Sequence, residues 1–150
     1  MGTLSANRLV IAFVTGFLAV PLCHQVMAAV LHAAGILPNA PWSIAPVPPF
    51  GVPQILSISF FGGLWGIVLR FVLGRFGGRG ARRLLVAAVF SGIALTLVAF
   101  LVVFPLKGIS PASLPPAAPL IGFVLNAVWG IGAMLMMDVA ERRLSVGAAG

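Results

Sequence analysis

The polar side chains that could do chemistry are few, and they lie inside long apolar stretches. They are His24, Gln25, Ser59, Thr96 and Asn126. Polar groups are costly in lipid and usually face the interior of a helix bundle or a water-filled cavity. We therefore predict that these five side chains form one hydrogen-bonded cluster. The cluster would either hold the helices together or bind a quinone, a haem or an ion.

Histidine chemistry is limited because the chain has two histidines, His24 and His32. On a continuous helix they would be about 12 Å apart along the axis, which is too far for one metal ion. A haem held by two histidines would need the second one from another chain. We expect no metal and no cofactor, with haem or quinone at His24 as the alternative. Cys23 is expected to be a small apolar filler.

The acidic residues are Asp138 and Glu141, at the end of the last apolar stretch. Proton-coupled transport commonly uses a carboxylate deep in the membrane, so this placement disfavours it. We expect Asp138 to pair with Arg70, Arg82 or Arg142, and Arg70 is the best-placed partner inside the bundle. The sequence offers no Ser/His/Asp set, metal-ligand cluster, phosphate loop or pair of mid-membrane carboxylates, so we do not expect an enzyme.

Four apolar stretches must position these residues, at about 9–31, 54–76, 82–104 and 119–140. Hydrophobic residues make up 61% of the chain and charged residues 7%, whereas a soluble domain carries about 25% charge. A bilayer core of about 30 Å needs about 20 helical residues, and each stretch meets that length. The sequence predicts an all-α bundle of four transmembrane helices that forms a single membrane domain over residues 1–150.

Arginine placement predicts the orientation of this bundle. Arg8 precedes the first stretch, five arginines surround the turn at 74–83, and Arg142 and Arg143 follow the last stretch. Loops rich in Lys and Arg stay in the cytoplasm, so both termini and this turn are predicted to be cytoplasmic. The five polar side chains then fall in the outer part of the membrane. We expect the turn to contact anionic lipid and not nucleic acid, because aromatic residues do not interleave with its arginines.

Small residues recur at helical spacing in every stretch. In lipid, helices associate through close packing of such residues, so we predict packing contacts at Gly16, Gly62, Gly63, Gly66, Gly92, Gly122 and Gly130. Trp65 and Trp129 lie near the middle of their stretches, although tryptophan usually lies at the headgroup level. Each would fill the space beside the glycine that follows it, or line a pocket for a cofactor or a lipid tail.

The connections at 32–53 and 104–119 are rich in proline and are predicted to be stiff. Gly35-Ile36-Leu37-Pro38 follows the first stretch, and Gly108-Ile109-Ser110-Pro111 follows the third. The chain is therefore either two tandem helical hairpins of common origin, or its biased composition produces the match by chance.

Four short segments carry a resemblance to known proteins: His24-Gln25, Leu31–Pro38, Phe61–Gly66 and Pro105–Gly108. With these segments the chain resembles an uncharacterised group of small four-span inner-membrane proteins of proteobacteria. The resemblance implies a multi-pass protein of the bacterial inner (cytoplasmic) membrane and carries no activity with it.

Together these features predict a non-enzymatic membrane protein. We expect an accessory or structural subunit that packs against a larger membrane complex or against copies of itself. A small oligomeric transporter or channel is one alternative, and a quinone- or haem-binding redox subunit is another.

The predicted orientation can be tested by thiol labelling. A cysteine placed in the turn at 74–83, in a chain without Cys23, should react with a membrane-impermeant reagent only after the inner membrane is opened. A cysteine in the connection at 32–53 is the control and should react while that membrane is intact. Labelling of the turn across an intact membrane would contradict the orientation.

Overall fold

The structure, a computed structural model, describes residues 6–147, with side chains for residues 6–144. Residues 1–5 and 148–150 of the predicted domain lie outside the described residues. Four helical spans are each long and apolar enough to cross a membrane: Ala6–Ala33, Gln54–Phe76, Ala81–Leu106 and Ala118–Leu144. The predicted all-α four-helix membrane bundle is therefore confirmed.

Two of the spans are composite. The first runs through α1 (Ala6–Ala19), the π-helical turn η1 (Val20–His24) and α2 (Gln25–Ala33). The third runs through α4 (Ala81–Val98), the π-helical turn η2 (Ala99–Val103) and α5 (Phe104–Leu106). The second and fourth spans are the single helices α3 (Gln54–Phe76) and α6 (Ala118–Gly147), and α6 continues about two turns beyond the predicted end.

A proline accompanies each π-helical turn. Pro21 lies within η1 and has no N–H to complete an α-helical bond. In this turn the N–H of Gln25 bonds to the carbonyl of Val20, five residues back, and so passes over the carbonyl of Pro21. Pro105 follows η2, where the N–H of Phe104 bonds to Ala99 in the same way. The first and third spans therefore share one irregularity.

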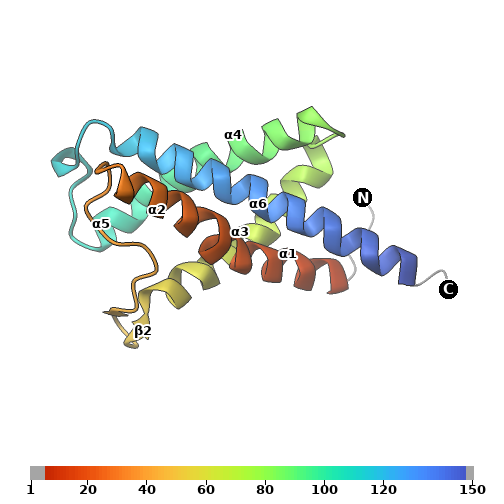
Figure 1. Ribbon diagram of the computed structural model, residues 1–150, viewed down its shortest axis with the longest axis horizontal. Coiled ribbons are helices and arrows are strands. Elements are labelled where there is room, and N and C mark those ends of the chain that lie inside the picture. Colours follow the sequence, from red (N-terminus) through yellow and green to blue (C-terminus); the bar gives the residue numbers. More distant parts are fainter. Residues whose placement is uncertain (1–5, 148–150) are drawn as a thin grey trace.

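The four spans pack as two hairpins. The contacts of α1 are mainly with α3, and those of α4 are mainly with α6, while α1 against α6 joins the two pairs. Figure 1 shows the start of α1, the end of α6 and the α3–α4 turn at one end of the bundle. This end is called the arginine end below, and the opposite end, which carries the proline-rich connections, is called the loop end.

The connections at the loop end contain little regular structure. The first holds a two-residue antiparallel pair, β1 (Pro46–Val47) with β2 (Val52–Pro53), in which Pro46 faces Pro53. The second holds the short 3-10 helix η3 (Pro111–Ser113). The small β-pair was not expected from the sequence, and it forms where proline prevents the helix from continuing.

Glycine brings the backbones of α1 and α3 into contact. A Cβ atom added to Gly16 would lie 2.8 Å from the Cα of Gly66, and one added to Gly62 would lie 2.9 Å from the carbonyl oxygen of Gly16. Gly63 has the ring of Phe13 against it, 2.6 Å from such an atom. Gly16 and Gly62 face backbone atoms, so a side chain at either position would force the two helices apart, whereas a side chain at Gly63 would displace the ring of Phe13.

Glycines also lie at the contact between α4 and α6. Gly130 of α6 lies against the carbonyl of Ala87 and the side chain of Ser91, and Gly92 of α4 lies under the ring of Phe123. Gly122 lies against Thr96. The structure thus places all seven predicted glycines at helix contacts. Ala87 and Ser91, which are fully buried, had not been singled out from the sequence.

Trp129 joins the two hairpins. Its side chain is 1% exposed, and its indole N–H donates to the carbonyl of Gly16 at 2.9 Å. Leu69, Met134 and Met137 are buried around the same core. Trp65 is half-buried, with its ring centroid 6.4 Å from that of Phe90. Of the two tryptophans, Trp129 is the one that lies in the centre of the bundle.

The close approach of α1 and α3 predicts opposite effects for two glycines of one helix. Gly66→Ala would drive a methyl group into the carbonyl of Ala12, and should lower the free energy of unfolding by about 1–3 kcal/mol. Gly74→Ala is the control, because nothing lies within 4 Å of the added atom. It should be neutral or stabilising by up to about 1 kcal/mol. Unfolding in mixed detergent micelles measures both, and equal effects would contradict the packing.

Candidate functional site

A cavity of about 540 Å³ lies at the loop end, between α2, the start of α3 and the first proline-rich connection. Its polar lining consists of His24, Gln25, Asn39, Ser43 and Gln54. This loop-end cavity contains two of the five polar residues singled out from the sequence, together with three from the connection and the start of α3.

The rest of the lining is apolar. Ile55 and Ile58 of α3, Ala28 of α2 and Leu125 of α6 form the side toward the bundle. Asp, Glu, Lys and Arg are absent from the residues that line this cavity in the described part of the chain. The cavity therefore offers neutral hydrogen-bonding groups at one side and hydrocarbon at the other, which suits an uncharged amphipathic molecule.

Trp42 holds the first proline-rich connection against the first span by two hydrogen bonds. Its backbone N–H donates to Oε1 of Gln25 at 2.8 Å, and its indole N–H donates to the carbonyl of Pro21 at 3.0 Å. The carbonyl of Pro21 is the one that the π-helical turn passes over, so the irregular turn supplies the acceptor. Trp42 has a φ of 51°, a left-handed conformation that strains a residue with a side chain. The two hydrogen bonds hold it there.

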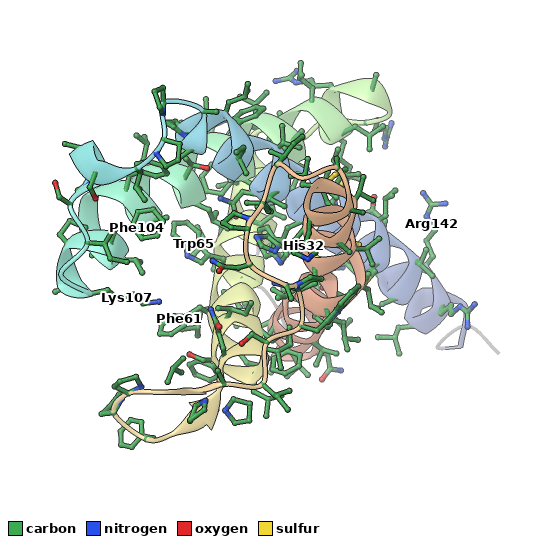
Figure 2. The ribbon with its side chains drawn as sticks, turned by 60° about the vertical axis from the view of Figure 1, so that its left-hand side comes forward. His32, Phe61, Trp65, Phe104, Lys107 and Arg142 are labelled. Carbon is green, nitrogen blue, oxygen red and sulfur yellow. The ribbon has the colours of Figure 1, made fainter. Side chains whose placement is uncertain are left out.

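His24 and Gln25 form one side of the cavity. Nε2 of Gln25 lies 3.4 Å from Nδ1 of His24, while Oε1 accepts from Trp42. His32, in contrast, is exposed, and its Nδ1–H donates to the carbonyl of Leu37 at 2.8 Å. Figure 2 brings the loop end forward and shows the connection that follows α2 crossing toward the start of α3. Phe104 of α5 and Lys107, which follows α5, lie apart from this connection.

The predicted five-residue polar cluster separates into two groups. Asn126 donates to Oγ1 of Thr96 at 3.0 Å and links α6 to α4, whereas His24 and Gln25 face the cavity. Within residues 6–144, no hydrogen bond joins the two groups, and buried Ser59 bonds to neither. The prediction of a single cluster is therefore wrong. The residues have similar depths along their helices, but they point toward different neighbours.

The acidic residues of α6 hold the arginine end together. Asp138 accepts from Nε and Nη2 of Arg83, with a shortest distance of 2.7 Å, and so ties α6 to α4. Glu141 lies 3.0 Å from Nε of Arg70 and ties α6 to α3. The sequence-based pairing of Asp138 with Arg70 is wrong, because Arg70 reaches the acid one helical turn further along. Arg83 had not been considered as a partner.

A second cavity, of about 570 Å³, lies beside these ion pairs. Among its lining residues are Arg8 of α1, Arg79 of the α3–α4 turn and Arg142 of α6. This arginine-end cavity is lined by charged groups from α1, the α3–α4 turn, α4 and α6, in contrast to the neutral cavity at the loop end.

No protein-family model, curated protein or solved structure matches the chain. The resemblance to a proteobacterial group stays a prediction. The four long apolar helices indicate a small four-span membrane protein. Among residues 6–147, no three His, Cys, Asp or Glu side chains gather in a way that could hold a metal ion.

Proposed function

We propose that the protein is a non-enzymatic subunit of the bacterial inner membrane that assembles with other membrane subunits or with copies of itself. Both of its termini would lie in the cytoplasm. The observation that carries this proposal is the closed centre of the bundle, which supports a packing role over transport through one chain.

The two cavities are separated by a buried layer. On α6 the loop-end cavity reaches Leu125 and the arginine-end cavity reaches Asp138, about 20 Å further along the helix. Between them lie Trp129, Met134 and Met137, each at most 2% exposed. An ion or polar solute needs a polar or hydrated path through the bundle. These three side chains occupy the volume that such a path would need.

The surface that remains is large and apolar. Within the apolar window of each span, 22–33% of residues are buried inside the chain. The remaining residues are available to contact lipid or helices of neighbouring subunits. Such helices can pack closely against small residues, as the four spans of this chain do with one another. The orientation is supported by the arginines, which gather at one end, whereas Lys107 is the single Lys or Arg in the two connections of the loop end.

The mass of the native particle and a flux measurement test this proposal together. Native mass spectrometry of a mild-detergent membrane extract should give a particle heavier than the 15.5 kDa of one chain. Vesicles that contain the purified chain should pass protons and potassium no faster than empty vesicles, because the centre is closed. A lone chain in the extract would contradict the proposal, and flux above the empty-vesicle level would favour a transporter.

The loop-end cavity favours a second role, the binding of a quinone-class molecule. Quinone carbonyls accept hydrogen bonds, which His24, Gln54 and Asn39 can donate, and the ring and tail would lie against Ile55 and Ile58. A haem fits less well, because His24 is the one histidine in the lining and His32 is exposed and bonded to a backbone carbonyl.

Titration with a short-chain quinone tests this second role. Binding should quench the tryptophan fluorescence of the chain, and the quenching should saturate. Gln54→Leu and His24→Leu should each weaken it by about threefold to tenfold, the effect of one lost hydrogen bond. Asn126→Leu is the matched control, because it removes an amide outside the cavity, and it should leave the affinity unchanged. Quenching that does not saturate, or an equal loss in all three variants, would contradict a site in this cavity.

A further inference from the structure

The arginine-end cavity is lined by more positive than negative charges. Four arginines line it: Arg8, Arg79, Arg83 and Arg142. They come from α1, the α3–α4 turn, α4 and α6, so the cavity exists only when the helices are packed. Asp138 and Glu141 also line it.

Both carboxylates are already engaged. Asp138 is held by two nitrogens of Arg83, and Glu141 is paired with Arg70, which approaches from α3 and is not part of the lining. Counting Arg70, the five arginines and two carboxylates around the cavity carry a formal net charge of +3. Neither Arg8 nor Arg79 has an ion-pair partner among residues 6–144.

This arrangement selects a particular ligand chemistry. The guanidinium group is a planar fork of N–H donors that matches the oxygens of a phosphate, and it stays charged at any physiological pH. A metal cation would be repelled by the charge excess, and a neutral molecule would leave it uncompensated. A cavity of about 570 Å³ has room for a phosphate group and the glycerol or sugar attached to it.

We propose that the arginine-end cavity is a binding site for a phosphate group, carried either by a lipid headgroup or by a free anion. Its lining residues belong to the start of α1, the α3–α4 turn, the start of α4 and the end of α6. These parts of the chain lie together at one end of the bundle (Figure 1). Basic pockets between helices at the cytoplasmic surface are where anionic phospholipid headgroups bind. The site goes beyond the proposed function, since it needs no partner subunit and no occupant of the loop-end cavity.

Binding in this open cavity differs from general attraction to a basic surface, and an arginine outside the lining can distinguish the two. Arg75 carries the same charge as Arg79 and lies four residues from it, but it does not line the cavity. Its guanidinium carbon lies 5.1 Å from the ring centroid of Phe76, on the exposed surface. Arg75→Ala therefore removes one charge from the same end of the molecule without touching the site.

The experiment compares this control with two lining variants in nanodiscs of phosphatidylcholine, with and without cardiolipin. Native mass spectrometry after detergent release counts the cardiolipin retained by each full-length chain. Arg8→Ala and Arg79→Ala should each lower retention by about fivefold, and Arg75→Ala should change it by less than about twofold. Arg79→Lys keeps the charge but loses the planar guanidinium group, so its cardiolipin retention should lie between that of Arg79→Ala and that of Arg75→Ala.

A second arm identifies the source of the phosphate. The thermal unfolding temperature in phosphatidylcholine alone is measured with inorganic phosphate and with chloride at equal ionic strength. Stabilisation by inorganic phosphate that Arg79→Ala abolishes identifies a soluble anion, and retained cardiolipin without such stabilisation identifies a lipid headgroup. The proposal is overturned if Arg75→Ala and Arg79→Ala reduce retention equally, or if neither cardiolipin nor inorganic phosphate binds to folded protein.

Discussion

The hydrogen bond from Trp129 to the carbonyl of Gly16 is the contact on which the bundle depends. In lipid the hydrophobic effect does not pull helices together, so packing and hydrogen bonds must do so. An indole N–H at mid-span also needs an acceptor, because none is available from water. Gly16 and Gly66 let α1 and α3 approach until their backbones touch, and the indole of α6 then reaches the Gly16 carbonyl. One interaction thereby joins both hairpins.

The closed centre leaves two ends with different chemistry. At the loop end, Pro21 disturbs the first span, the π-helical turn frees its carbonyl, and Trp42 uses that carbonyl to hold the connection over a neutral cavity. At the arginine end, two carboxylates of α6 bind arginines of α3 and α4 and leave further arginines around a charged cavity. Each end thus combines interactions that join its elements with a cavity.

The sequence was informative where a property depends on residues close together in the chain. Helix length and apolar content located the four spans, and the spacing of Gly62, Gly63 and Gly66 indicated a packing face on one helix. It was misleading where two helices must be compared. Similar depth in the membrane predicted that Asn126 and His24 belong to one cluster, yet Asn126 bonds to Thr96 of α4 and not to His24. Likewise, Arg70 pairs with Glu141 and not with Asp138. The role of Trp42 could not be predicted from the sequence, since one of its two acceptors, the carbonyl of Pro21, is freed by a π-helical turn.

The sequence by itself therefore determined that the helices suit a lipid environment, where the four helices lie and through which small residues they pack. Length, hydropathy and helical period are local properties of the chain. Tertiary structure alone decided how the two hairpins join, which arginine meets which carboxylate, and where the two cavities lie. Those outcomes depend on how each helix is rotated about its axis, and in lipid that rotation is fixed by side-chain fit between neighbours and not by an apolar face turned away from water.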